Sequence, residues 1–404
     1  MATRAVAVCA AVIAVGWLGN PVDGAVVAAR QRCSSRMDCS LLGECVAGAC
    51  RCSKGWRGID CGAADLAPLD VSLGYHNVTE SSWGGRPVFD AASGKWQLLA
   101  TEIKNKCPLI LFQYNSMVIR AVSKGADPGG PYTKAEVVLP PFHHNPTIVG
   151  PTPDGYYLLF FIGANNASDE IDCRTSIPNV PFHPEAASLP NGYITMAYTK
   201  DVVNGPWQQR VVLRDNNGTN PEAAGWHYIQ NNPSAHILPN GTVVLVFRAN
   251  AAQNVGEQLG VAVAPHWSAN FETNPDPIVT HSGKSDPDNE DPFVWMQPDG
   301  TWHIVNHQQG ANNVCGSSID GHSCGAHWFA SSPFGPWQQS VEPAYNAHVT
   351  LSNGSARAFQ TRQRPQLVFD KDMVPLYLFT SGSFDGNNPD LQMVTHTYAH
   401  AFNH

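Results

Sequence analysis

Hydrophobic and polar residues follow a pattern that recurs five times between Arg86 and Thr380. Each copy has a polar residue, a proline, an apolar run, a turn and a second apolar run. The copies read RPVFDAASGKWQLLAT, NPTIVGPTPDGYYLLFF, NPSAHILPNGTVVLVFR, DPFVWMQPDGTWHIVNH and RPQLVFDKDMVPLYLFT. Three of the turns contain Asx-Gly pairs, which are strong signals of two-residue hairpin loops. Proline suits the first residue of a strand, where no ladder donor is required. Each copy therefore predicts a β-hairpin.

A third apolar run follows each hairpin, as in NSMVIRAVS and EQLGVAVAP, and three copies continue into a Gly-Pro-aromatic turn before a fourth run. Four strands repeated five times predict an all-β five-bladed β-propeller over residues 66–404. The last copy ends at its third strand, so we expect Leu66–Thr79 to supply the fourth. A β-sandwich with similar hairpins is the alternative, and it explains the matching third strands less well.

The composition narrows the function classes. The chain has 404 residues, 24 Lys+Arg and a net charge of -9. It has no basic stripe, so nucleic acid is not an expected partner. Charged residues make up only 14%, whereas Gly and Pro number 35 and 31. This mixture is typical of a turn-rich all-β chain.

The N-terminus predicts export. Arg4 precedes an apolar run, Ala5–Leu18, and small residues follow at 25–29, so residues 1–29 are expected to be a cleaved signal peptide. An uncleaved anchor helix is the alternative. Of 11 cysteines, Cys9 leaves with the signal and the other ten can pair, which indicates an oxidising, extracellular compartment. Five N-glycosylation sequons are compatible with a secreted glycoprotein: Asn77, Asn166, Asn217, Asn240 and Asn353.

Six cysteines crowd into Cys33–Cys61, whose final stretch reads CRCSKGWRGIDC. This spacing, C-x-C-x-x-G-W-x-G-x-x-C after three earlier cysteines, resembles the EGF-like domain, assigned here to residues 30–62. The resemblance implies the pairs Cys33–Cys45, Cys39–Cys50 and Cys52–Cys61. It also implies a module that could associate with a cell wall or matrix. Outside the module, Cys315–Cys324 would close a local loop, and Cys107–Cys173 would then connect neighbouring blades.

Propeller geometry selects candidate site residues. The first strand of a blade begins at the same rim of the central tunnel where the second strand ends, so these two sets of residues should line one face. The first-strand set contains Arg86, His143, His144, Asn145, Asn232, Glu290, Asp291 and Arg364. The second-strand set contains Glu102, Arg248 and His307. Carboxylates and histidines on a concave rim are typical of glycosidic-bond cleavage.

The five-bladed layout, the strand-opening Asp291-Pro292 and the A-x-S…GPW phrase resemble glycoside hydrolase family 43 and its invertase-like relatives. That likeness covers roughly Leu66 to the C-terminus. Those enzymes place Asp, Asp and Glu at the openings of blades 1, 2 and 3. Aligned on the prolines, this chain has Arg86, Asn145 and Asn232 there. The usual carboxylate trio is therefore absent.

A relocated catalytic set is the leading hypothesis. Asp291 and Glu290 offer a general base, with Glu102 as a further carboxylate, and His143 as the proton donor, since imidazole titrates near neutral pH. His144 and His307 are alternative donors and sugar-binding groups, with Asn145 and Asn232. The guanidinium groups of Arg86, Arg364 and Arg248 suit sulfate or carboxylate, which favours an anionic sugar, unless each pairs with a rim acid.

The sequence contains no metal-ligand spacing such as H-E-x-x-H, so no metal site is predicted from motifs. The resemblance suggests only a structural calcium in the tunnel. Three functions remain open: a secreted glycoside hydrolase acting on a polysaccharide or oligosaccharide, a non-catalytic glycan-binding or adhesive propeller, and a uronic-sugar lyase. A carbohydrate is the expected partner in all three, and stable membrane insertion is not expected.

Overall fold

The computed structural model describes residues 32–163, 170–175, 194–213, 225–227, 229–250, 256–280, 286–310, 312–316, 323–384 and 394–404. Residues 32–404 form one compact unit. The expected signal peptide at 1–29 and the sequons at Asn166 and Asn217 lie outside the described residues. No helix within the described ranges is long and apolar enough to cross a membrane.

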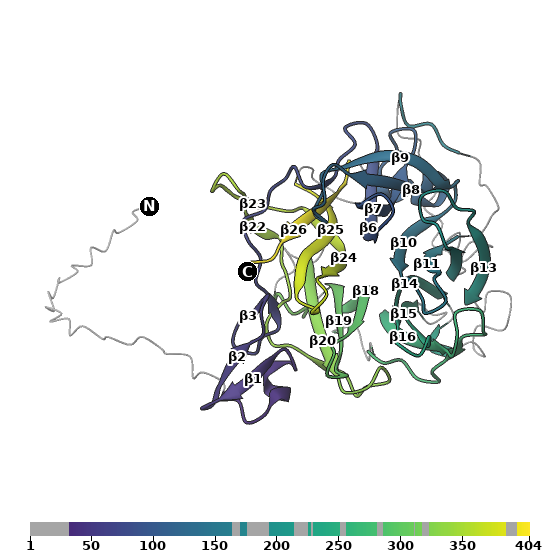
Figure 1. Cartoon of the computed structure of the whole chain (residues 1–404). Coiled ribbons are helices and arrows are strands. Elements are labelled where there is room, and N and C mark those ends of the chain that lie inside the picture. The colour runs from purple at the N-terminus through teal and green to yellow at the C-terminus, as the bar shows by residue number, and fades with distance from the viewer. Residues whose placement is uncertain are drawn as a thin grey trace, which may run out of the picture. The chain divides into compact units, whose positions relative to one another are not determined.

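Five four-stranded antiparallel sheets confirm the five-bladed β-propeller (Figure 1). Blade 1 contains β6 (Ser81–Asp90), β7 (Lys95–Ile103), β8 (Ser116–Ser123) and β9 (Tyr132–Leu139); blade 2 contains β10 (His144–Val149), β11 (Tyr157–Ile162), β12 (Ile194–Thr199) and β13 (Gln208–Leu213). Blade 3 contains β14 (Ile229–Ile237), β15 (Val243–Asn250), β16 (Glu257–Ala264) and β17 (Glu272–Thr273); blade 4 contains β18 (Asp288–Met296), β19 (Trp302–Gln309), β20 (Cys324–Ala330) and β21 (Gln338–Gln339). Blade 5 contains β24 (Thr361–Phe369), β25 (Pro375–Ser383), β26 (His396–Ala401) and β5 (Gly74–Tyr75).

The first strand of each blade is innermost, and the inner strands contact one another in a closed ring, β6–β10–β14–β18–β24–β6. Between the blades, the apolar faces of adjacent sheets form the core, for example around Phe160 and Phe247, which are fully buried. Shorter elements connect the strands: η2 (Leu109–Leu111), α1 (Phe112–Asn115), η3 (Gly225–His227), β22 (His348–Thr350) and β23 (Ala356–Ala358).

Blade 5 is completed from the N-terminal side, as the sequence predicts. Strand β5 pairs with β26, where Thr397 opposes Tyr75 and Tyr398 opposes Gly74. Gly74 has φ +94, and a Cβ there would lie 2.1 Å from the carbonyl oxygen of Thr397, so glycine is required. This pairing closes the ring by hydrogen bonds between distant parts of the chain.

The same closure corrects the expected role of Glu102. Its carboxylate is buried and accepts hydrogen bonds from Tyr75 Oη (2.5 Å), from Asn77 Nδ2 (3.0 Å) and from the Lys134 ammonium. Tyr75 belongs to the closing strand, so Glu102 ties that strand to blade 1. Alternate residues of a strand face opposite sides of the sheet. Position at a strand end therefore did not establish that this side chain faces the tunnel.

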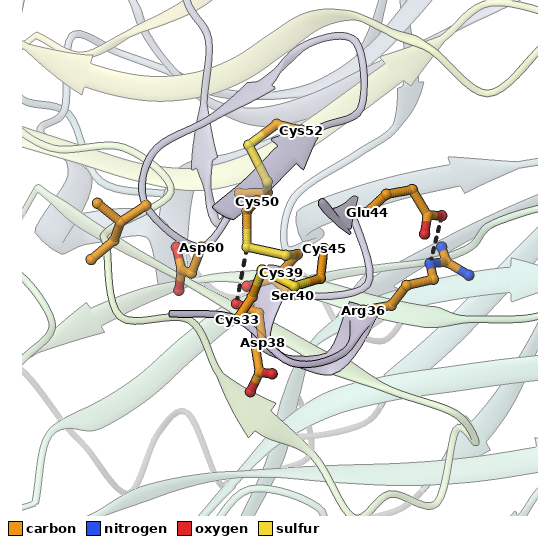
Figure 2. Close-up of a disulfide and its surroundings, with 12 residues drawn as sticks. Cys33, Arg36, Asp38, Cys39, Ser40, Glu44, Cys45, Cys50, Cys52 and Asp60 are labelled. Atoms are coloured by element: carbon orange, nitrogen blue, oxygen red, sulfur yellow. Dashed lines mark hydrogen bonds and ion pairs between the residues drawn. A yellow bond between two sulfur atoms is a disulfide. The ribbon is translucent and has the colours of Figure 1, made fainter. Parts of the chain in front are cut away.

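The cysteine-rich module (residues 32–64) contains η1 (Arg36–Cys39), the hairpin β1 (Gly43–Val46) and β2 (Ala49–Cys52), and the short pair β3 (Trp56–Arg57) and β4 (Ala63–Ala64). Figure 2 shows its half-cystines gathered near the Arg36–Glu44 ion pair. All five disulfides have the pairings expected from the sequence: Cys33–Cys45, Cys39–Cys50, Cys52–Cys61, Cys107–Cys173 and Cys315–Cys324.

The module shares its core with the propeller. The Trp56 ring is 5% exposed and stacks on Trp295 at 5.9 Å and on His327 at 5.3 Å between centroids. Polar contacts surround this stack: Arg36 Nη2 donates to Asp299 Oδ2 at 2.8 Å, and the backbone N–H of Val341 donates to Asp60 Oδ2 at 2.5 Å. The module therefore packs against blade 4 as part of the same folded unit.

Trp56→Ala should lower the free energy of unfolding of the whole protein by about 3–5 kcal/mol, because it removes a buried indole from a shared core. Chemical denaturation followed by fluorescence and by circular dichroism measures this loss. Ile59→Ala in the same module is the control: Ile59 is 49% exposed, and its loss should cost about 0.5 kcal/mol or less. An unchanged propeller transition in Trp56→Ala would mean that the module is only tethered.

Candidate functional site

Every inner strand begins with a β-bulge that turns side chains toward the ring. In every blade the register with the second strand shifts near the start of the inner strand, and the residue that follows the last paired residue before the shift has left-handed backbone geometry. These residues are Gly84 (φ 62), Asn145 (φ 54), Asn232 (φ 48), Asp291 (φ 53) and Arg364 (φ 54). Glycine, asparagine and aspartate tolerate this region, whereas a long side chain rarely adopts it. Bulges re-aim side chains beside functional sites.

The bulges correct the alignment of blade 1. Trp83 and Arg86 flank the bulge there, just as His144 and Thr147 flank it in blade 2. Gly84, not Arg86, is therefore the equivalent of Asn145. The copies of the repeat were aligned on proline, but in blade 1 the bulge is formed by Gly84-Gly85 before Arg86-Pro87. The prediction that Arg86 opens blade 1 beside Arg364 was wrong.

Arg86 instead lies farther along the inner strand. Its Nε donates to the carbonyl of Leu367 in blade 5 at 3.2 Å, its Nη1 donates to the carbonyl of Ile148 in blade 2 at 3.2 Å, and its guanidinium lies 5.2 Å from the ring centroid of Phe293 in blade 4. One side chain thus contacts the inner strands of three other blades. A guanidinium here disfavours a second cation, so the residues of this part of the tunnel do not fit the suggested calcium.

Arg364 connects four blades at the rim. Its side chain is fully buried, its Nη1 donates to Asp291 Oδ1 at 3.1 Å, and its Nη2 donates to the carbonyl of Asn145 at 2.9 Å. Its backbone N–H donates to Asp291 Oδ2 at 3.2 Å. A Cβ on Gly84 would lie 3.4 Å from Arg364 Nε, so the side chain passes directly over blade 1. Arg364 therefore pairs with an acid and is not free for an anionic ligand.

Three charged side chains form the more exposed part of the rim. Arg248 at the end of β15 donates from Nη1 to Glu290 Oε1 at 2.8 Å and lies with Nη2 3.1 Å from Glu257 Oε1. The side chains of Arg248, Glu257 and Glu290 are 16%, 14% and 17% exposed. Arg248 thus bridges two carboxyl groups, one from blade 3 and one from blade 4. We call these three residues the rim triad.

The two carboxyl groups of the rim triad have opposite pKa shifts. Burial alone would raise the pKa of Glu290, but His307 and Arg248 together lower it to about 2. Burial raises the pKa of Glu257 well above its usual value; Arg248 opposes this effect and Glu290 adds to it. One carboxyl is therefore ionised at neutral pH, while the other tends to keep its proton. Neighbouring carboxyl groups separated in this way are typical of acid–base pairs.

Asp291 and His307 lie next to Glu290 and are more deeply buried than it is. His307 is fully buried, and its Nδ1 lies 3.6 Å from Glu290 Oε2. Asp291 is 2% exposed and is held by Arg364; burial, only partly offset by Arg364, raises its pKa. One ligand atom from each of Glu290, Asp291 and His307 lies within 4.8 Å of the others. Because two guanidinium groups already neutralise these carboxylates, the group does not fit a divalent cation.

Amide side chains continue the rim into blades 2 and 3. Asn145 Nδ2 donates to Asn232 Oδ1 at 2.7 Å, and Asn232 Nδ2 donates to Glu290 Oε1 at 3.3 Å. The structure therefore brings together Asn145, Asn232, Glu290, Asp291, Arg364, Arg248 and His307 from the predicted set.

The two adjacent histidines of blade 2 occupy different environments. His143 is fully buried against Phe161, and its Nδ1 contacts the carbonyl of Pro140, so the ring is enclosed by the protein. His144 stacks on Phe112 at 4.5 Å, and its Nδ1 lies 2.8 Å from Ser116 Oγ. Burial, followed by the charge of Arg364, lowers the pKa of His144 well below its usual value, so the ring is neutral.

Sequence reasoning missed Glu257. It begins the third strand of blade 3 and lies opposite Asn250, the last residue of the second strand, so it shares the rim edge. The signal was present: Glu257 is the polar residue immediately before the apolar run QLGVAVA. Third-strand starts lie at the same edge as first-strand starts and should be included in such a search.

No model of a known protein family matches this chain, and no curated protein matches it in sequence. Solved structures share its fold. An α-L-arabinofuranosidase catalytic domain of family GH62 from Coprinopsis cinerea aligns with a TM-score of 0.54 and 13% identity, over 83% of this chain and 95% of that chain. The α-L-arabinofuranosidase of Podospora anserina gives 0.52 and 12%, over 83% and 95%. A family 117 glycoside hydrolase from the marine bacterium Zobellia galactanivorans gives 0.50 and 14%, over 83% and 88%. At these identities the likeness establishes the fold alone.

Glu290→Gln and Glu257→Gln should change stability with opposite signs at pH 7. The folded pKa of Glu290 is about 2, below its ordinary value of 4.5, so its stabilising effect is complete above pH 4.5 and disappears as the pH falls toward 2. Glu290→Gln should therefore lose about 1–3 kcal/mol at pH 7 and little in acid. The raised pKa of Glu257 means that folding takes up a proton above pH 4.5, so wild type loses stability as the pH rises. Glu257→Gln lacks this proton uptake and should become more stable relative to wild type as the pH rises.

Denaturant titrations between pH 3 and pH 8 measure both differences from wild type. Glu272→Gln, on the exposed side of β17, is the matched control and should follow wild type throughout. Parallel pH curves for the two rim variants would show that the two carboxyl groups share one electrostatic environment, which contradicts the assignment.

Proposed function

We propose that this protein is a glycoside hydrolase whose catalytic pair is Glu257 and Glu290. The observation that carries the proposal is the pair itself: two partly exposed carboxyl groups on one rim, bridged by Arg248, with pKa values shifted in opposite directions. Glycosidic-bond cleavage needs one carboxylic acid to protonate the leaving oxygen and one carboxylate on the other side of the reacting carbon. The shared fold with arabinofuranosidases is consistent with this chemistry.

In this mechanism Glu257 is the general acid. Its Oε2 has no hydrogen-bond partner in the described part of the chain, so no described protein group competes for a proton on this oxygen. Glu290 remains ionised and faces the anomeric carbon. It acts either as a general base that activates a water molecule or as the nucleophile that attacks this carbon. The two carboxyl groups differ in protonation because His307 and Arg248 lower the pKa of Glu290, whereas burial and the charge of Glu290 raise that of Glu257.

The substrate we propose is a neutral glycan. Both rim arginines are already paired with carboxylates, so neither is left for a sulfate or uronate group. Extracellular action is supported by the five disulfides, which form in oxidising compartments.

A non-catalytic glycan-binding role is the second candidate, and one observation favours it. The bulge residues of blades 1, 2 and 3 are Gly84, Asn145 and Asn232, where the resembled enzymes carry acids. A rim of amides binds sugar hydroxyls without cleaving the glycosidic bond. We find no specific observation that favours a uronic-sugar lyase.

Turnover should separate the two candidates. Product release is measured on arabinan, arabinoxylan and a panel of algal and plant-wall glycans. Glu290→Gln and Glu257→Gln should each lower the rate by about 10²–10⁴-fold. With an aryl glycoside whose leaving group needs no proton, Glu257→Gln should recover most of its activity, whereas Glu290→Gln should not.

Glu272→Gln again serves as the control and should keep wild-type turnover, with thermal melts verifying that each variant is folded. Wild-type activity retained by folded Glu257→Gln and Glu290→Gln would remove the pair from the mechanism. Tight glycan binding by wild type without any turnover would establish the glycan-binding role instead.

A further inference from the structure

The opposite end of the tunnel carries a second concave site. A hollow of about 510 Å³ lies at the far ends of the inner strands of blades 1, 2 and 3. Most of its lining side chains are aliphatic or proline, namely Val88, Val149, Pro151, Pro153, Leu238 and Pro239, and polar groups contribute about half of the lining surface. Small-molecule sites typically have this size and combine apolar side chains with a few placed polar groups. The rim triad stands where these strands begin, so the two sites are at different mouths of the tunnel.

Arg86 is the one cation that lines this hollow among the described residues, and no carboxylate lines it there. No ion pair to Arg86 occurs within the described ranges, and its hydrogen bonds go only to the carbonyls of Leu367 and Ile148. These bonds use two of the five guanidinium N–H donors, so three remain, both protons of Nη2 among them. Arg364 and Arg248 at the other mouth, by contrast, are both neutralised by acids.

Arg86 is partly buried, and a charge that is partly withdrawn from water without a carboxylate partner leaves its remaining donors available to a ligand. Burial lowers the pKa of Arg86 to about 10, which leaves it charged at neutral pH. The neighbouring His236 cannot compensate, because burial and the charge of Arg86 lower its pKa to about 4, so it is neutral. Asp154 directly follows the lining residue Pro153 in the sequence. It accepts hydrogen bonds from Thr152 Oγ1 and Trp267 Nε1 and does not line the hollow. No described residue therefore supplies a counterion to Arg86.

We propose that the hollow binds a small carboxylate with an apolar body, whose carboxylate pairs with Arg86. The free donors of the guanidinium match the two oxygens of a carboxylate. The walls offer a sugar few partners: the Thr152 hydroxyl is already bonded to Asp154, so, apart from Arg86 itself, His236 is the remaining polar side chain among the described lining residues. Proline and aliphatic walls suit a ring or short hydrocarbon chain. This site is independent of the proposed glycosidase function.

Isothermal titration at constant ionic strength with benzoate and benzamide, which differ mainly in charge, tests this site. Wild type should bind benzoate at least about tenfold more tightly than benzamide, since a charge-assisted contact is lost with the amide. Arg86→Met should weaken benzoate binding by about tenfold or more and leave benzamide binding unchanged. Leu238→Trp, which fills the hollow without removing the charge, should abolish binding of both ligands.

Two controls isolate the site. Arg210 also donates to backbone carbonyls, those of Trp267 and Ala269, but it does not line the hollow. The variant Arg210→Met should therefore bind both ligands like wild type. Glu290→Gln should also leave benzoate binding intact, which separates this site from the proposed catalytic pair. Equal affinity for benzoate and benzamide, absence of benzoate binding to wild type, or undiminished benzoate binding in Leu238→Trp would overturn the proposal.

Discussion

The charge-assisted contact between Arg364 and Asp291 organises the rim of this propeller. Arg364 adopts left-handed backbone geometry at φ 54, which is unfavourable for a long side chain, and its guanidinium is fully buried. Both costs are offset because the same residue bonds to blade 4 through Asp291 and to blade 2 through the carbonyl of Asn145, and covers Gly84 in blade 1. Removing either partner would leave a buried charge uncompensated. Four blades therefore depend on one ion pair.

This arrangement explains why the candidate catalytic groups lie in blades 3 and 4. Arg364 occupies the space over blade 1 and engages blade 2, so a carboxylate at those openings would have no room or would be drawn into the ion pair. Arg248 is the second guanidinium of the rim, and it sits where Glu257 and Glu290 converge. The acids are thus concentrated on one side of the ring, and their mutual repulsion separates their pKa values.

Arg86 divides the tunnel electrostatically. At the rim, acids and guanidinium groups pair with one another. At the opposite mouth, the Arg86 guanidinium bonds to two backbone carbonyls and faces a hollow that no described carboxylate lines. Its contacts to Leu367, Ile148 and the Phe293 ring also connect blades 5, 2 and 4 through a side chain from blade 1. One arginine therefore contributes the contacts between blades that a tunnel cation would otherwise supply. Buried carboxyl groups with raised pKa values, such as Glu257, reduce stability at neutral pH, and these contacts between blades oppose that loss.

The sequence by itself determined the local features. Alternating apolar runs and Asx-Gly turns specify hairpins, their five-fold repetition specifies a propeller, and the incomplete last copy requires a strand from before the first blade, which β5 provides. The resemblance of the cysteine-rich segment to the EGF-like domain implied its three disulfide pairs, which the structure contains. These features depend on periodicity and short loops, which are encoded within a few residues of each other.

Only the tertiary structure decided where individual side chains point. In blade 1 the bulge lies two residues earlier relative to the proline than in the other blades, so Arg86 lies near the far mouth and not at the rim. Alignment on the prolines could not show this, because the proline of blade 1 is not part of the bulge. Glu102 faces the closing strand, and Glu257 reaches the rim from a third strand. The strand register, the direction of each side chain and the pairing of charges depend on contacts between blades that are far apart in the chain. No local pattern encodes those contacts.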